Sequence, residues 1–458
     1  MRTVIGLIIL SLSLAGCASV SQWLASQEAA SEPSSEAVAT NQPTPLPIDQ
    51  GPFNVFDLGK DSQVVGKLRK VQVGKDDTLL DIARRYDLGF DEIAAANPEI
   101  DVWLPGEGKE VLVPTQFVLP PVSHTGIVIN VATRRLYYFP KNKSGKVTQV
   151  ITYPIGIGRD GWATPIGDTK VIAKEANPSW QVPISIRQEH AKKGEKLPAV
   201  VPPGPDNPLG LFAFRLDIPS YLIHGTNKPY GIGMRVSHGC VQLYPEDIES
   251  LYKQVPVGTP VQIINRPHLA GWRDGQLYLE VHYPLEEDAN NKLPLAKVLK
   301  AEIARAVKLA PKEAKPVDDA KVHVAVERHL GYPLPISRDS ASVKELLASV
   351  TLVAQPPDRH GIDKIIASTA KESAGDKRAG WFIQAGSFRD ENGAKRRNAV
   401  INNLPHPRPF QIVADDTFHR VLSGPYSSRE EAQRHVRTID QKLGLKTIVV
   451  HSSSVPAG

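Results

Sequence analysis

Two polar stretches without apolar periodicity interrupt this chain of 458 residues. Residues 20–50 are rich in Ala, Ser, Glu, Gln and Pro, and residues 341–376 carry at most one weak helix, around Val343–Val350. Segments of this kind bury too little apolar surface to fold alone, so we expect a tether and a linker. Since the chain is about three usual domain lengths long, the remainder is expected to form roughly three folded units.

Composition and charge narrow the classes of function. Lys and Arg number 54 against 49 Asp and Glu, and no block of like charge is long enough for a nucleic-acid arm. Hydrophobic residues make up 41% of the chain, which suits ordinary cores and excludes a protein with many membrane spans. The formal net charge of +5 is compatible with binding to an anionic surface or a cell wall.

The N-terminus has the pattern of an export signal. Arg2 precedes the mainly apolar run Val4–Leu14, which is too short to span a bilayer. Leu14–Cys17 resembles the bacterial lipobox. That resemblance implies removal of residues 1–16, acylation of Cys17, and placement in the periplasm on the inner face of the outer membrane, since no Asp follows the cysteine. An ordinary secretory signal cleaved nearby is the alternative. Residues 17–66 would then be the lipidated tether.

Residues 67–115 predict a small βααβ unit. Thr78 can cap a first helix, and Asp81 completes a capping box. A second helix is expected to end at Asn97, because proline follows it. Glu110–Val113 supplies the closing strand.

This unit resembles the lysin motif, a module that binds N-acetylglucosamine-containing glycans. The resemblance implies binding to peptidoglycan glycan strands, and a helical spacer with the same core is the alternative. The residues that carry it are Gly74, Asp77-Thr78-Leu79, Ile82-Ala83, Tyr86, Asn97-Pro98, Pro105-Gly106 and Val111–Pro114.

Residues 122–266 are β-rich and predict a sandwich or curled sheet. The strands are expected at Gly126–Val131, Leu136–Phe139, Val147–Pro154, Asp168–Lys174, Phe212–Leu216, Tyr221–His224 and Thr259–Ile264. Gly156–Gly161 reads GxGxxG, but Trp162–Gly167 cannot begin the helix that a dinucleotide site needs, so we interpret it as a loop.

Residues 267–340 are expected to be an appendage of the β-rich domain. They contain a strand at Gln276–Val281 and two amphipathic stretches, 295–309 and 317–330.

Residues 377–453 consist of two similar halves. Gly386, Phe388 and Ala394 recur at constant spacing as Gly424, Tyr426 and Ala432, which predicts two βαβ units. Together with Gln384, Ser387, Arg420-Val421, Pro425 and Ser427, these residues resemble the sporulation-related repeat domain. The resemblance implies an α+β ferredoxin-like fold that binds peptidoglycan strands stripped of stem peptides. A generic domain that docks another protein is the alternative.

Cys240 is the one cysteine besides Cys17, and two nearby histidines, His224 and His238, precede it. A thiol needs a neighbouring base or positive charge to become a thiolate. His224 and His238 can each supply that base, and the residues alone do not choose between them. Glycine at 239 lets the amides of Gly239 and Cys240 point at a developing oxyanion.

Other interpretations of the same residues stay open. His224, His238 and Cys240 are possible zinc ligands, although the spacing is uncommon and a fourth ligand is unassigned. His238 can be a structural histidine, and Cys240 an inert, buried one.

The pattern of a histidine, a gap and Ser237–Cys240 resembles the bacterial L,D-transpeptidase catalytic domain. The resemblance extends over the domain through Thr164–Gly167, Asn177–Trp180 and Pro202–Gly210. It implies Cys240 as nucleophile, His224 as proton acceptor and donor, and the Gly225 carbonyl as the group that orients the imidazole. Ser237, His238 and Gly239 would shape the oxyanion pocket. Gln242 would bind substrate, although many relatives carry Arg or Asn there. No metal or cofactor is implied.

The family implies attack on the third residue of a tetrapeptide stem, release of the terminal D-alanine and a thioester at Cys240. An amine then takes the acyl group, either diaminopimelate of another stem or the C-terminal lysine of an outer-membrane lipoprotein. Water as acceptor would make the protein a carboxypeptidase. A multidomain, lipid-anchored peptidoglycan transpeptidase is therefore expected, and a non-catalytic wall-binding protein is the alternative.

Overall fold

The computed structural model describes residues 46–47, 51–59, 62–75, 77–192, 196–290, 294–357, 380–388, 391–402, 408–414, 418–443, 445 and 447–452. The expected signal peptide, Cys17 and the later part of the expected linker lie outside these residues. In the described part of the chain, no helix combines the length and apolar character that crossing a bilayer requires.

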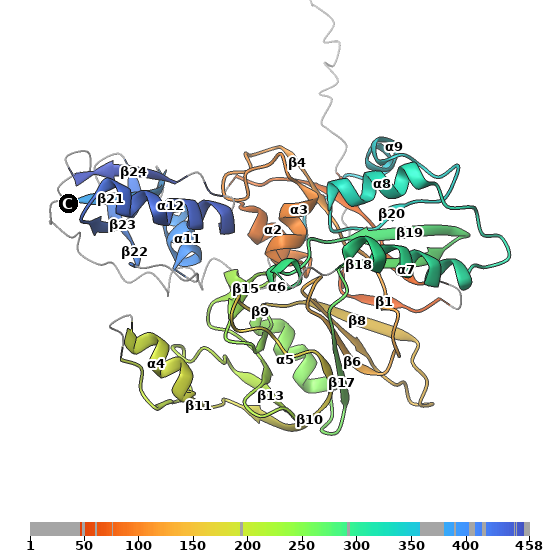
Figure 1. Ribbon diagram of the computed structural model, residues 1–458, viewed down its shortest axis with the longest axis horizontal. Coiled ribbons are helices and arrows are strands. Elements are labelled where there is room, and N and C mark those ends of the chain that lie inside the picture. The colour runs from red at the N-terminus through yellow and green to blue at the C-terminus, as the bar shows by residue number, and fades with distance from the viewer. Residues whose placement is uncertain are drawn as a thin grey trace, which may run out of the picture. The chain divides into compact units, whose positions relative to one another are not determined.

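A nine-stranded sheet organises the β-rich domain, in the order β1-β8-β7-β6-β17-β10-β13-β14-β16 (Figure 1). Neighbours are antiparallel except for the parallel pairs β6–β17 and β14–β16. The strands are β1 (Val55–Asp57), β6 (Gly126–Asn130), β7 (Arg135–Phe139), β8 (Gln149–Pro154), β10 (Gly167–Ala176), β13 (Phe212–Leu216), β14 (Leu222–His224), β16 (Val241–Gln242) and β17 (Pro260–Ile264). Each strand expected between residues 122 and 266 forms at the expected place.

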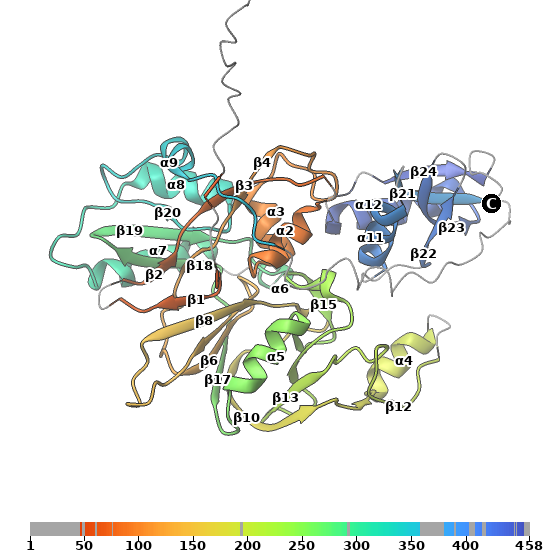
Figure 2. The same cartoon turned by 180° about the vertical axis from the view of Figure 1, so that it is seen from behind.

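Both faces of this sheet are covered by other elements. Its strands therefore carry apolar residues on both sides, whereas a sheet with one face in solvent alternates apolar and polar residues. On one face lies α5 (Pro245–Gln254) (Figure 2). This helix buries Ile248 and Leu251 against side chains such as Ile129 and Phe214. On the other face, Val128, Tyr137, Phe139 and Val150 share a core with the βααβ unit.

The βααβ unit forms as the sequence predicts. It contains β3 (Arg69–Gln72), α2 (Leu79–Arg85), α3 (Phe90–Ala96) and β4 (Glu110–Val113), with β3 and β4 antiparallel. The capping box of Thr78 and Asp81 is present, and α3 ends at Asn97. The side-chain amide of Asn97 also donates hydrogen bonds to the Ile93 and Leu112 carbonyls, which ties the helix end to β4.

Residues 268–350 build a third layer. A sheet of β18 (His268–Arg273), β19 (Gln276–Val281) and β20 (Leu334–Pro335) packs with α7 (Leu295–Lys308), α8 (Asp319–Arg328) and α9 (Val343–Ser349). Its core includes Leu68, Ala96 and Leu112 of the βααβ unit. Leu285 of the same segment packs in the core of the nine-stranded sheet, so the segment contacts both the βααβ unit and the catalytic domain.

Two segments expected to be flexible are ordered. Within the expected tether, β1 joins the nine-stranded sheet and β2 (Val64–Gly66) pairs with β5 (Gln116–Val118). Within the expected linker, the Val353 amide donates to the Lys70 carbonyl at 2.9 Å. Short strands in polar segments are missed because their pairing partners are remote in sequence.

The C-terminal unit is a four-stranded antiparallel sheet in the order β22-β23-β21-β24, with two helices between its strands. It comprises β21 (Trp381–Phe388), α11 (Glu391–Ile401), β22 (Phe410–Ala414), β23 (His419–Tyr426), α12 (Arg429–Leu443) and β24 (Ile448–His451). Each expected half thus contributes a strand, a helix and a second strand.

Candidate active site

The sheet topology brings the histidine and cysteine motifs together. β14 ends at His224, and β16 begins directly after Cys240. These strands are parallel neighbours, with His224 opposite Gln242. Cys240 directly precedes Val241, which pairs with Ile223, and the Cys240 and His224 side chains line the same cavity.

A tight turn presents the thiol. The Ser237 hydroxyl accepts a hydrogen bond from the Gly239 amide at 3.1 Å and donates one to the Cys240 carbonyl at 2.6 Å. Gly239 has a φ of +105°, and a Cβ there would approach the Tyr221 ring to 2.7 Å. Only glycine fits this turn without strain.

His224 is oriented by its neighbour. Its Nδ1 lies 2.6 Å from the Gly225 carbonyl, so Nδ1 carries the proton and donates it. A neutral imidazole in this tautomer has Nε2 as its basic nitrogen. Burial lowers the pKa of His224 to about 4, because desolvation disfavours the imidazolium.

Cys240 is half-buried, and its Sγ donates to the Ser220 carbonyl at 3.8 Å. Burial raises the pKa of this thiol to about 11, because desolvation disfavours the thiolate. Desolvation thus favours the neutral form of both side chains.

His238 belongs to a separate polar cluster. Its Nε2 lies 3.0 Å from Arg159 Nη2 and 3.3 Å from Glu189 Oε2, and the Trp162 ring meets the imidazole edge-on at 4.8 Å between centroids. Desolvation and the Arg159 charge lower the pKa of His238 to about 4.

Most of the residues that the sequence singled out line one cavity of about 880 Å³. They are His224, Ser237, His238, Cys240 and Gln242. Gly225 and Gly239 act through backbone hydrogen bonds, to the His224 imidazole and the Ser237 hydroxyl. The sequence did not single out Arg159, Trp162, Glu189 and Tyr221, which also line the cavity. Arg159 and Trp162 stand in and beside the GxGxxG loop, but nothing in the sequence links Glu189 to the site.

The zinc alternative finds no support in the described residues, where His, Cys, Asp and Glu side chains nowhere gather as three or more possible metal ligands. The GxGxxG segment is a loop, as expected. Its β9 (Ile157–Gly158) pairs with β15 (Arg235–Ser237), and turns follow.

Comparison with known proteins places the chain in a family. The YkuD model, described as the L,D-transpeptidase catalytic domain, matches residues 124–263, and the SPOR domain model matches residues 377–451.

Two curated relatives are similar over much of their length. The protein named Probable L,D-transpeptidase ErfK/SrfK of Salmonella typhimurium is 42% identical, over 60% of this chain and 88% of the relative. Probable L,D-transpeptidase YbiS of Escherichia coli is 46% identical, over 49% of this chain and 73% of the relative.

The chain therefore belongs to the L,D-transpeptidase family. It is a peptidoglycan transpeptidase whose C-terminal SPOR domain binds peptidoglycan, and it works at the cell wall, in a periplasmic-type location.

Proposed function

We propose that Cys240 is the nucleophile of this transpeptidase and that His224 Nε2 takes its proton. The observation that carries the proposal is the bond of 2.6 Å between His224 Nδ1 and the Gly225 carbonyl, which leaves Nε2 as the basic nitrogen in the cavity that holds the thiol. Because burial disfavours either charge alone, the thiolate and the imidazolium are expected to form together, each stabilising the other.

The proposed donor is a tetrapeptide stem of peptidoglycan. Sγ attacks the carbonyl carbon of the third residue, the C–N bond to the terminal D-alanine breaks, and the proton held by His224 leaves with the D-alanine amine. A thioester at Cys240 remains. An amine then attacks the thioester, His224 takes the amine proton, and the sulfur leaves as the thiol.

The Cys240 amide is the proposed oxyanion donor. The Gly239 amide is already bonded to the Ser237 hydroxyl, so Ser237 and Gly239 would act by fixing the turn that aims the Cys240 amide. His238 would border the pocket, and Gln242, which lines the cavity, would offer its amide to the peptide.

The proposed acceptors are the free amine of diaminopimelate in another stem or the C-terminal lysine of a lipoprotein. Water as acceptor would instead give an L,D-carboxypeptidase. A protein that only binds the wall is the alternative from another class.

Mass spectrometry of muropeptides tests these possibilities. The chain without its export signal is incubated with tetrapeptide-rich sacculi, and crosslinked dimers with loss of D-alanine are expected. Tripeptides without dimers would identify the carboxypeptidase. Cys240→Ala should lose D-alanine release by at least roughly a thousandfold, because the nucleophile is absent. Unchanged release by this variant would overturn the proposal.

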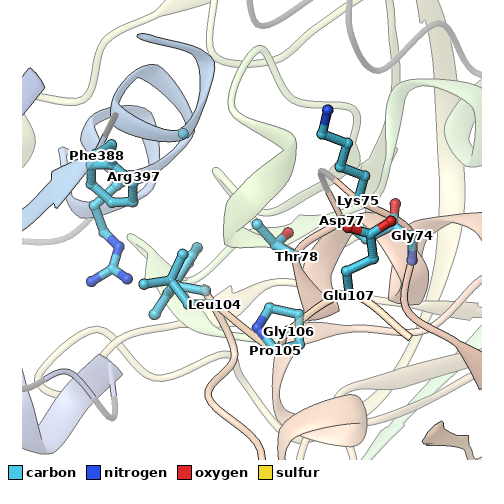
Figure 3. Close-up of a pocket in the computed structure, with 12 residues that line it drawn as sticks. Gly74, Lys75, Asp77, Thr78, Leu104, Pro105, Gly106, Glu107, Phe388 and Arg397 are labelled. Carbon is cyan, nitrogen blue, oxygen red and sulfur yellow. The ribbon is translucent and has the colours of Figure 1, made fainter. Parts of the chain in front are cut away.

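We further propose that the βααβ unit binds N-acetylglucosamine-containing glycans, as a lysin motif would. Two of its loops line a pocket, one through Gly74 and Thr78 and the other through Leu104 and Gly106 (Figure 3). Leu104 is 61% exposed, and an exposed apolar side chain beside polar loop groups suits the face of a sugar ring.

Binding of soluble N-acetylglucosamine oligomers tests the glycan site. Leu104→Asp should weaken binding at least several-fold. Leu309→Asp is the matched control, since Leu309 is 57% exposed at the end of α7 and does not line this pocket. Equal weakening by both variants would argue against the site.

Lipid attachment at Cys17, on the outer membrane, is our proposal for the anchor. It rests on the lipobox-like Leu14–Cys17. Mass spectrometry of the protein purified from membranes should show an acylated Cys17 at the new N-terminus, and Cys17→Ser should abolish the modification. An unmodified mature N-terminus would favour an ordinary secretory signal.

A further inference from the structure

An insertion between β10 and β13 lines one side of the catalytic cavity. It contains β11 (Trp180–Gln181), α4 (Ile184–Lys192) and β12 (Val200–Val201), and Trp180, Ile186 and Glu189 contribute to the cavity wall. Ile186 is the only buried residue of α4. Apolar packing therefore holds this helix weakly, and polar contacts carry more of its attachment.

One of those contacts is an ion pair across the cavity wall. Arg159 Nη2 donates to Glu189 Oε1 at 2.7 Å and to Oε2 at 2.6 Å. The same nitrogen lies 3.0 Å from Nε2 of His238, two residues before the thiol. The Arg159 amide also donates to the Ser237 carbonyl at 3.0 Å, which fixes the arginine backbone to the turn that presents Cys240.

The pair is arranged so that one carboxylate can replace another. The Arg159 and Glu189 side chains are 18% and 21% exposed, so solvent and ligands reach them, and the cost of separating a pair of this kind is low. Arg215, which also lines the cavity, is paired with Glu175 of the adjacent strand β10. Arg159 therefore differs from Arg215, because its partner stands on the weakly packed α4.

We propose that Arg159 is a substrate-positioning residue that binds a carboxylate of the donor stem peptide, and that Glu189 occupies its place until the donor arrives. The inference rests on the proposed function, which supplies an anionic peptide. Such a stem has carboxylates at its C-terminus and on the side chain of its diamino acid. When either binds, Arg159 changes partner and α4 loses its ionic attachment.

The test uses the full chain without its export signal and three synthetic donors. These are the tetrapeptide, its C-terminal amide, and the tetrapeptide amidated on the diamino-acid side chain. Release of D-alanine or D-alaninamide gives kcat and KM for the wild type, Arg159→Met, Arg159→Lys and Glu189→Gln. Glu249→Gln, which removes an exposed charge paired with Lys253 on α5, is the matched control.

The wild type should prefer the donor with both carboxylates over one of the two amides by about tenfold in kcat/KM, and the amide that suffers identifies the bound group. Arg159→Met should abolish that preference, and Arg159→Lys should restore part of it. Glu189→Gln should lower KM for the unmodified donor several-fold and leave the discriminated amide unchanged. Glu249→Gln should leave both values unchanged.

Equal loss on all three donors with Arg159→Met would overturn the inference, because a merely structural role would affect them alike. Binding of the same peptides to the Cys240→Ala chain, by calorimetry and with or without Arg159→Met, separates this result from failure of the proposed function. An inactive wild type that still discriminates the amide in binding would refute the chemistry and keep the carboxylate site. Binding without discrimination would refute the site.

Discussion

Two arginine–glutamate pairs in this protein have the same chemistry and different surroundings. Arg135 and Glu92 join β7 to α3 with side chains 1% and 6% exposed, whereas Arg159 and Glu189 join a cavity loop to α4 at 18% and 21%. Arg135 also donates to the Thr152 hydroxyl and the Asp87 carbonyl, and Glu92 accepts from the Gly89 amide. The first pair is fully satisfied by its surroundings.

Burial decides what each pair can do. A buried charge that loses its partner has no water to replace it, so the pair between the βααβ unit and the sheet is a fixed structural contact. In a pair whose side chains are 18% and 21% exposed, water or another ion can replace either partner. The difference separates a fixed structural contact from the pair that we propose takes part in binding the donor.

The largest expected effect lies in the catalytic region. His224→Gln should lower the rate of D-alanine release about 10²- to 10⁴-fold, because the general base is lost while an amide can still donate to the Gly225 carbonyl. Steady-state kinetics beside a urea unfolding curve measures both properties, and the unfolding midpoint should change little. If His238→Gln shows the greater loss instead, the base is His238.

The two ion pairs can be compared directly by substitution. Glu92→Ala should lower the free energy of unfolding by about 3–5 kcal/mol, because it leaves Arg135 buried and uncompensated. Glu189→Ala should lower it by less than about 1 kcal/mol. Urea denaturation gives both values, and similar losses would contradict the distinction drawn from burial.

A buried pair of carboxyl groups should make the protein more stable as the pH falls, which is the opposite of ordinary acid denaturation. Asp87, after α2, has its pKa raised from 3.8 to about 7, mainly by desolvation and despite the Arg135 charge, and burial also raises that of nearby Asp247 on α5. The folded state prefers the protonated carboxyl. Its contribution to the free energy of unfolding is therefore full below pH 4 and is lost as the pH rises to about 7.

The free energy of unfolding, measured between pH 4 and 8, checks this sign. Asp247→Asn mimics the protonated partner, removes the repulsion and should flatten the decline. The exposed Glu249→Gln should leave the slope unchanged. A slope that is identical in the wild type and Asp247→Asn would show that the carboxyl pair does not control it.

A small effect is expected for a local contact of the βααβ unit. Thr78→Ala should lower the free energy of unfolding by about 1 kcal/mol, because the Asp81 amide loses its capping acceptor. Urea denaturation measures the loss, and a loss as large as that of Glu92→Ala would mean that the cap supports more than its own helix.

Local patterns were sufficient for much of this molecule. The strands of the catalytic domain and the capping box at Thr78 follow from alternation and side-chain chemistry, and the structure has them where the sequence predicts. The lysin-motif identity of the βααβ unit and the roles at the catalytic site remain predictions. Pairing partners that are far away in the sequence could not be predicted, so β1 and β2 were assigned to a tether.

The sequence by itself determined which residues are the candidates for the chemistry, because a histidine followed by Ser237–Cys240 resembles the pattern of the L,D-transpeptidase family. Only the tertiary structure decided that burial lowers the pKa of His224 and raises that of Cys240, and that Glu189 stands beside Arg159. Protonation depends on burial and on partners far away in the sequence, and folding alone brings these together.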